Sequence, residues 1–281
     1  MREKRAPDRP LRWVFRGLFG LVFVYAFNLW WTPPLGWDVW RASNVPGDTI
    51  EILGIGRHSA TVIFIHGLAG NAAQVVPVVA RLRQRLWQVS FLLPSATFLP
   101  LTAKGAVDTL AWFDIDNVQL TPDDPLPELE DEEGMEKVIT RIHGLIDGEM
   151  AKGIEQERIV LVGFSQGCAS ALLSAISSEA KIAGVACMSG WLPLSYKIKK
   201  VGTHVRHPLQ TDHAHHMPVF WGHGELDDVV HLRWAEESIA HLADLGFENI
   251  DYNIYPYLKH DMGKEEKQDL EDWLAKLLPP T

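Results

Sequence analysis

The stretch Arg158-Ile-Val-Leu-Val-Gly-Phe-Ser-Gln-Gly167 decides the fold class of this chain. Residues 158–164 are predicted to form a strand, because they contain the apolar and largely β-branched run Ile159-Val-Leu-Val162. Gly163 and Gly167 then flank Ser165 in a G-x-S-x-G pattern, and a helical pattern follows. Only small residues fit beside the central residue of so tight a turn. The stretch therefore predicts a strand, a sharp turn and a helix, with the Ser165 hydroxyl exposed at the turn.

The alternation of strand and helix continues on both sides of this stretch. Further strands are predicted over residues 60–65, 89–93, 182–188, 218–221 and 250–255, and helices over residues 74–86, 134–153 and 265–278. The core-facing stripe of the second helix is predicted to be Met135, Val138, Ile139, Ile142, Ile146 and Met150. This pattern indicates an α/β fold, with a mostly parallel, doubly wound sheet and helices on both faces. Functional sites of such folds lie at the carboxyl ends of the strands.

The composition excludes several classes of protein. A length of 281 residues with 47% hydrophobic side chains is typical of one globular domain. The net charge of −10 argues against a nucleic-acid partner, because an acidic chain repels phosphate backbones. Two cysteines, Cys168 and Cys187, are too few for a disulfide framework and lack metal-site spacing. We expect Cys168 to be a small buried side chain rather than a reactive thiol, and we expect no metal or other cofactor.

The first 45 residues differ from the rest, so we expect the α/β domain to span residues 46–281. Residues 1–16 carry six basic and two acidic side chains, and residues 17–31 are apolar apart from Asn28. Fifteen helical residues rise about 22 Å, which is short of the roughly 30 Å hydrocarbon core of a membrane. Counting from Leu11 gives a sufficient 21 residues. The segment is interpreted as a single span, an interfacial helix, or a helix covering the domain's own apolar surface.

Membrane contact through residues 11–31 is therefore expected, and two locations follow from it. An interfacial helix leaves a cytoplasmic protein attached to the membrane through its N-terminus. A spanning helix keeps the basic end in the cytosol and places the catalytic domain in the lumen.

A serine nucleophile needs a histidine base and a carboxylate, which follow it in the order Asp, His in this type of fold. Residues 218–230 predict a strand that ends in an acidic turn holding Glu225, Asp227 and Asp228. His260 lies in a loop after the strand at 250–255. We therefore expect His260 to remove the Ser165 proton and one carboxylate within residues 225–228 to orient it.

Two backbone amides are expected to stabilise the oxyanion that such a nucleophile generates. The amide of Gln166 directly follows the serine. The second is the amide of Leu68, in the loop after the strand at 60–65, where Gly67 lets the backbone turn. His66 precedes that turn and is expected to form structural hydrogen bonds rather than to react.

Several motifs occur together in one order: Phe64-Ile-His-Gly-Leu68, Pro94-Ser-Ala-Thr-Phe-Leu-Pro-Leu101, Trp112-Phe-Asp-Ile115, Lys152-Gly-Ile154, Gly163-Phe-Ser-Gln-Gly167, Ser189-Gly-Trp-Leu-Pro-Leu194, His223-Gly-x-x-Asp227 and Lys276-Leu-Leu-Pro-Pro280. In this order they resemble the acyl-protein thioesterase branch of the phospholipase/carboxylesterase family, over about residues 60–281. The resemblance implies an α/β-hydrolase fold and no metal.

The resemblance also implies a role for individual residues. The family's nucleophile corresponds to Ser165, its histidine to His260, and its acid to Asp227 in preference to Asp228. Its oxyanion amides correspond to Leu68 and Gln166, and its acyl pocket to Leu68, Trp191 and Val229. The chain departs from the family pattern at Ala69-Gly70-Asn71, at Asp228 where a proline is usual, and in the longer, His-rich segment 195–217.

The implied activity is hydrolysis of acyl thioesters on S-palmitoylated proteins. A carboxylesterase or lysophospholipase acting on small or lipid esters is the alternative enzyme. A membrane-tethered binding module with a hydrolase-like fold is the non-enzymatic alternative. The acidic stretch 122–133 is expected to be a solvated loop, or else a lid or docking segment. His213-Ala-His-His216 is interpreted as a solvated loop rather than a metal site, and Trp112, Trp191 and Trp221 as groove or core residues.

Overall fold

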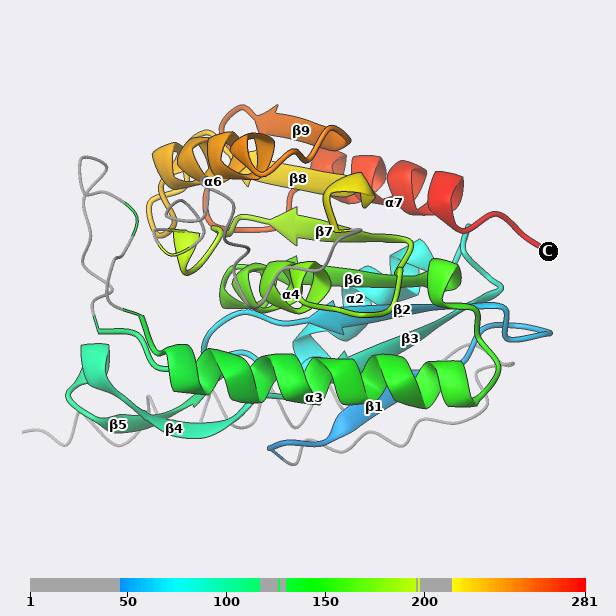
Figure 1. Cartoon of the computed structure of the whole chain (residues 1–281), viewed down its shortest axis with the longest axis horizontal. Helices are drawn as coiled ribbons and strands as arrows, with labels where there is room; N and C mark the ends of the chain where they lie inside the picture. The colour runs from blue at the N-terminus through cyan, green and yellow to red at the C-terminus, as the bar shows by residue number, and fades with distance from the viewer. Residues whose placement is uncertain (1–45, 117–125, 127–129, 196, 198–213) are drawn as a thin grey trace, which may run out of the picture. The chain divides into compact units, whose positions relative to one another are not determined.

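A seven-stranded sheet organises the domain (Figure 1). The structure is a computed structural model, and it describes residues 46–116, 126, 130–195, 197 and 214–281. In spatial order the strands are β1 (Thr49–Ile52), β3 (Val89–Pro94), β2 (Ala60–Ile65), β6 (Ile159–Phe164), β7 (Gly184–Met188), β8 (Val219–Gly224) and β9 (Ile250–Tyr255). Neighbours pair in parallel, except that β1 lies antiparallel to β3 at one edge. The predicted α/β fold with a mostly parallel sheet is confirmed.

Helices cover both faces of this sheet. One face is covered by α3 (Glu132–Ala151), α4 (Gln166–Ile176) and α6 (Leu232–Asp244), and the other by α2 (Ala72–Leu82) and α7 (Lys264–Leu277). Along β2, Ile63 and Ile65 belong to the first core, whereas Val62 and Phe64 belong to the second. Because both faces of the strand are buried, its sequence is a continuous apolar run instead of an alternating one.

Three features of this architecture were not predicted from the sequence. They are the antiparallel strand β1, the hairpin of β4 (Thr97–Leu101) and β5 (Val107–Ala111), and the helix α6. Among the described residues, no helix has both the length and the apolar character that a membrane crossing requires. The basic and apolar segment 11–31 lies outside the described residues.

The last turn of α3 corrects the predicted core stripe of that helix. Met150, which the prediction placed in the stripe, is 38% exposed, whereas Glu149 is only 1% exposed. With 3.6 residues per turn, position 149 lies closer than position 150 to the mean direction of the other five residues of the stripe, so it stays on the buried face. The helix therefore directs a carboxylate inward in its last turn.

Hydrogen bonds and a charged neighbour offset the cost of burying the Glu149 carboxylate. Thr61 donates its hydroxyl to Glu149 Oε2 at 2.5 Å, and Lys152 Nζ donates to Oε1 at 2.7 Å. His58 Nε2 lies 2.8 Å from the Thr61 hydroxyl and 3.3 Å from Glu149 Oε2. These four residues, the amino-edge cluster, lie where β2 begins.

A disulfide joins Cys168 of α4 to Cys187 of β7. The expectation that Cys168 is buried holds, because both cysteines have no exposed surface. This single bond was not predicted, because the sequence analysis considered only a disulfide framework and a metal site. Cys187 lies beside Gly163 in the pairing of β6 with β7, so the bond ties the helix after Ser165 to the strand beside it.

Candidate active site

Ser165 occupies the tight turn between β6 and α4, as the sequence predicts. Its φ of +55° lies in the left-handed region, which a residue with a side chain rarely adopts. A Cβ on Gly163 would lie 2.1 Å from the Gly167 carbonyl oxygen, and a Cβ on Gly167 would lie 2.1 Å from the Ile65 carbonyl oxygen. Neither position has room for a side chain, which explains both glycines of the G-x-S-x-G pattern.

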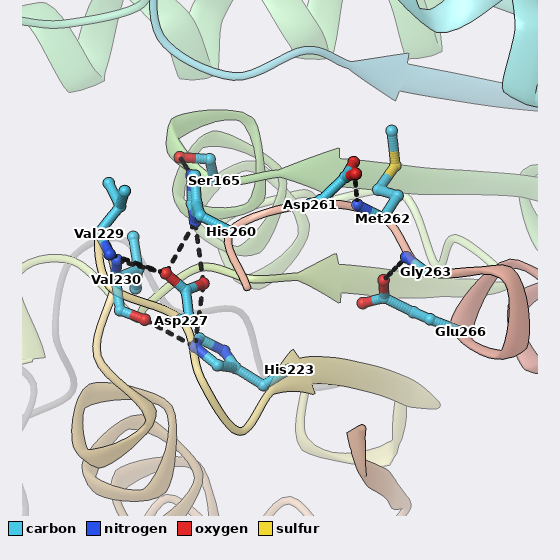
Figure 2. Close-up of polar contacts among 10 residues, drawn as sticks. All are labelled: Ser165, His223, Asp227, Val229, Val230, His260, Asp261, Met262, Gly263 and Glu266. Atoms are coloured by element: carbon cyan, nitrogen blue, oxygen red, sulfur yellow. Dashed lines mark hydrogen bonds and ion pairs between the residues drawn. The ribbon is translucent and has the colours of Figure 1, made fainter. Parts of the chain in front are cut away.

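Ser165, His260 and Asp227 form a continuous chain of hydrogen bonds, shown in Figure 2, which we call the carboxyl-edge cluster. His260 Nε2 lies 2.9 Å from Ser165 Oγ, and Nδ1 lies 2.9 Å from Asp227 Oδ2. The carboxylate only accepts hydrogen bonds, so the proton of the neutral imidazole is on Nδ1. His260 Nε2 is therefore the acceptor that faces the serine hydroxyl.

Asp227 is held as an anion by the groups around it. Burial alone would raise the pKa of Asp227. Hydrogen bonds from His260 and from the amides of Val229 and Val230 outweigh that effect and lower its pKa below the usual value. Both amides donate to Oδ1, at 3.0 and 2.9 Å. The charged form is thus favoured where it faces His260.

The other two carboxylates of the acidic turn lie elsewhere. Asp228 pairs with Lys259 at 3.0 Å and has a side chain that is 62% exposed. Glu225 is exposed. The structure therefore brings Asp227, and not Asp228, against His260.

His223 is a second histidine beside Asp227 that the sequence analysis used only as part of a motif. Its Nε2 donates to the Val230 carbonyl oxygen at 2.8 Å and lies 3.5 Å from Asp227 Oδ2 (Figure 2). Burial lowers the pKa of His223, which favours the neutral form of the ring. Through its hydrogen bond to Val230, His223 stabilises the turn that carries Asp227.

Leu68 and Gln166, whose amides are the predicted oxyanion donors, both lie near the serine. Both residues line the pocket that contains Ser165. A Cβ on Gly67 would lie 3.1 Å from Ser165 Cβ, which shows how closely the Leu68 loop approaches the serine. Neither amide has a hydrogen-bond acceptor among the described residues.

The loops that carry these amides are fixed by buried side chains. Gln166 Oε1 accepts from the Trp112 amide at 3.0 Å, and its Nε2 donates to the Phe113 carbonyl oxygen at 2.7 Å. His66 accepts from the Ala96 amide through Nε2 at 2.9 Å and donates from Nδ1 to the Gly67 carbonyl oxygen at 2.7 Å. Burial lowers the pKa of His66 to about 4, so it is neutral and structural, as expected.

A cavity of about 310 Å³ opens beside Ser165 and has mostly apolar walls. Its lining includes the three predicted substrate-binding residues Leu68, Trp191 and Val229, together with Ile115, Phe164, Val230 and Trp234. Trp221 is fully buried in the core, and Trp112 donates its indole N–H to the His66 carbonyl oxygen instead of lining the cavity.

Sequence reasoning missed two residues near this cavity. Trp234 lies in the unpredicted helix α6, and Glu130 lies in the acidic stretch that was expected to be solvated. Glu130 is instead partly buried, and burial raises its pKa to about 7. Its contacts with apolar and aromatic neighbours gave no sequence signal. Most of the stretch 122–133 and of the His-rich segment 195–217 lies outside the described residues.

A family model and individual relatives match most of this chain. The model described as Phospholipase/Carboxylesterase matches residues 51–278. Acyl-protein thioesterase 1 of Gibberella zeae is 37% identical over 227 residues, which cover 80% of this chain and 93% of the relative. Acyl-protein thioesterase 1 of Cryptococcus neoformans is 34% identical over 233 residues, which cover 79% and 93%.

Solved structures show the same fold. The crystal structure of Zea mays acyl-protein thioesterase 2 aligns with a TM-score of 0.69 and 27% identity, covering 83% of this chain and 99% of that one. Arabidopsis thaliana SOBER1 aligns with a TM-score of 0.69 and 26% identity, covering 78% and 99%.

Proposed function

Because the chain belongs to the phospholipase/carboxylesterase family of α/β hydrolases, we propose that it is a serine hydrolase that cleaves acyl thioesters on S-acylated proteins. One observation carries this proposal: the hydrogen-bonded carboxyl-edge cluster opens onto an apolar cavity. The names of the relatives from Gibberella zeae and Cryptococcus neoformans support the choice of a thioester.

In the first half of the reaction the acyl group moves from sulfur to the serine. Ser165 Oγ attacks the carbonyl carbon of the thioester while His260 Nε2 takes the hydroxyl proton. Asp227 keeps the imidazole in the required tautomer and stabilises its charged form. The carbonyl oxygen becomes an oxyanion, which accepts hydrogen bonds from the amides of Leu68 and Gln166. The C–S bond then breaks, and His260 gives its proton to the departing sulfur.

In the second half, water releases the acyl group. His260 takes a proton from a water molecule, whose oxygen attacks the acyl carbon of the ester on Ser165. The same two amides hold the second oxyanion. The bond to Ser165 Oγ then breaks, the serine recovers its proton from His260, and a carboxylic acid leaves. The apolar cavity lined by Leu68, Trp191 and Val229 accommodates the acyl chain.

Membrane contact through residues 11–31 forms the second part of this proposal. The antiparallel direction of β1 supports it, because the strand begins at Thr49, opposite Pro94 at the end of β3. The chain therefore enters the domain at the carboxyl edge, where Ser165 also lies. Attachment of the chain to a membrane through its N-terminus would raise the local concentration of the enzyme where acylated substrates are held.

The alternative function is hydrolysis of lipid or small oxygen esters on the luminal side of a membrane. The Cys168–Cys187 disulfide favours this alternative, because disulfides persist in oxidising compartments. Cytosolic S-acylated proteins would then be out of reach.

The experiment that tests the proposal compares two substrates with the purified full chain in detergent. One is a peptide palmitoylated on cysteine, and the other is a short carboxylic ester, with Ser165→Ala as the control. Release of palmitate that depends on Ser165 supports the thioesterase. Ester cleavage alone supports the alternative enzyme. If neither substrate is cleaved and Ser165 resists a fluorophosphonate probe, the chain is a binding module. Protease protection of the domain in sealed vesicles decides its orientation.

A further inference from the structure

One wall of the acyl cavity is held by a carboxylate from outside the cavity. Glu130 Oε1 accepts from the indole N–H of Trp191 at 3.2 Å, and Oε2 accepts from the Leu194 amide at 2.5 Å. Trp191 lines the cavity, whereas Glu130 and Leu194 do not. Glu130 therefore bonds both to a side chain of the wall and to the backbone that carries this side chain.

Only a carboxylate can make this pair of contacts. Both partners of Glu130 are N–H donors, so both of its oxygens must accept. A glutamine would direct its own N–H₂ group against one of the two donors. Burial raises the pKa of Glu130 to about 7, which shows that the charge is costly at this position. A costly acid kept beside an apolar wall is more typical of a functional residue than of a structural one.

The rest of the Trp191 segment is also anchored. The Leu192 amide donates to Ser238 Oγ of α6 at 2.8 Å. Trp191 packs edge-on against Trp234, which also lines the cavity, with ring centroids 6.4 Å apart. Leu194 has a φ of +54° in the left-handed region, so its backbone needs an external partner to hold it. Among these contacts, the one from Glu130 reaches the indole nitrogen and fixes how the ring faces the cavity.

We propose that Glu130 is a specificity-determining residue: it holds the indole of Trp191 in the cavity wall and so sets the preference of the site for long acyl chains over short ones. The proposal rests on the proposed function, in which the acyl chain occupies this cavity. An acetyl group extends too little beyond the reacting carbon to depend on the wall. A dodecanoyl chain needs the wall, and it loses contact when the indole turns away.

The test uses the full chain at pH 8, with acetyl and dodecanoyl esters of p-nitrophenol as substrates. Glu130→Gln lowers the ratio of kcat/KM for dodecanoyl over acetyl about tenfold, the change expected when about two methylene groups lose contact. The loss lies in KM for the long ester, and kcat for the acetyl ester is unchanged. Glu132→Gln is the matched control, because Glu132 is a neighbouring carboxylate whose partner is Lys197.

A second variant shows whether Glu130 acts through the indole. Trp191→Phe removes the N–H and keeps an aromatic ring, so it lowers the same ratio. The double variant is then no worse than the worse single variant, because both substitutions break one interaction. Trp191→Phe also carries the test if Glu130→Gln does not fold.

Binding separates this inference from the proposed function. In Ser165→Ala protein, calorimetry with laurate gives a Kd that Glu130→Gln raises about tenfold, the same change as in the kinetics. If laurate binding depends on Glu130 but the chain with Ser165 intact cleaves no acyl substrate, the inference is supported and the proposed function is overturned. Changes below twofold in both the ratio and the Kd, or effects of the two substitutions that add, overturn the inference.

Discussion

The same three chemical groups occur at opposite ends of the central sheet. The carboxyl-edge cluster links a hydroxyl, an imidazole and a carboxylate in that order. The amino-edge cluster of His58, Thr61, Glu149 and Lys152 has the same groups, but its hydroxyl lies between the imidazole and the carboxylate. The two differ in the direction of their hydrogen bonds. In the amino-edge cluster the Thr61 hydroxyl donates straight to Glu149, so it must accept from His58 Nε2. In the other, His260 Nε2 accepts from Ser165.

This difference decides which hydroxyl can become a nucleophile. An imidazole that donates to a hydroxyl cannot take its proton, so His58 is no base toward Thr61. Lys152 also neutralises Glu149, and Thr61 has no exposed surface. Ser165 opens onto a cavity instead. Composition alone therefore does not make a catalytic cluster, because the direction of proton donation and access for a substrate also decide it.

The largest loss of activity is expected when the hydrogen bond between His260 and Ser165 is reversed in direction. In Asp227→Asn, the amide oxygen faces the amides of Val229 and Val230, so the N–H₂ group faces His260 Nδ1. The imidazole then carries its proton on Nε2 and cannot accept from Ser165. We expect kcat to fall by about 10³–10⁴ with little change in Tm. Ester hydrolysis and thermal melting measure both quantities. Asp228→Asn is the control, and an equal loss of activity in it would contradict this assignment.

At the amino-edge cluster we expect a loss of stability without a loss of activity. Glu149→Ala leaves Thr61 and Lys152 without their buried partner, and we expect the free energy of unfolding to fall by about 3–5 kcal/mol. Urea denaturation measures the loss, and kcat per folded molecule stays unchanged. Glu51→Gln, at the exposed partner of Lys152, is the control. A large loss of activity in folded Glu149→Ala protein would contradict a purely structural role for the amino-edge cluster.

The disulfide beneath the carboxyl-edge cluster is expected to contribute to stability rather than to chemistry. In the chain-entropy account, a disulfide that closes a short loop stabilises a protein by about 3 kcal/mol. Cys187→Ala and the double variant Cys168→Ala/Cys187→Ala should lose similar stability, because either one removes the bond. Additive losses would show that the thiols act independently. Thiol titration of the denatured protein without reductant should detect no free cysteine.

The smallest effect is expected at Glu266, a third buried carboxyl group, at the start of α7. Burial raises its pKa to about 8. The folded state therefore binds this proton more tightly than the unfolded state, and its contribution to stability is lost as the pH rises through about 8. Between pH 6 and 9, Tm of the native chain should fall by a few °C more than Tm of Glu266→Gln. Parallel pH profiles would contradict this expectation.

Local pattern and chain order were enough to predict some of this site. The glycines beside Ser165 are a local steric requirement, and His260 follows a strand in the expected order. Within the acidic turn, local pattern left three carboxylates open, and only the family resemblance favoured Asp227. The choice depends physically on which carboxylate two amides turn toward His260.

Features that depend on contacts between distant segments could not be predicted. The pairing of Cys168 with Cys187 requires α4 to lie across β7, which no sequence spacing encodes. Glu130 lies in an acidic, proline-rich stretch, so its polar neighbours suggested solvent. In the last turn of α3 the prediction took Met150 as the buried residue instead of Glu149, because a predicted helical stripe can be wrong by one residue near its end.

The Cys168–Cys187 bond also bears on how samples of this protein are to be compared. Protein made in a reducing cytosol would carry two thiols, whereas protein made in an oxidising compartment would carry the bond. The two products differ by a pair of hydrogen atoms, at a bond between the helix that follows Ser165 and the neighbouring strand. Intact mass measured without reductant distinguishes them. Each measured activity should then be assigned to the oxidised or the reduced form that the mass identifies.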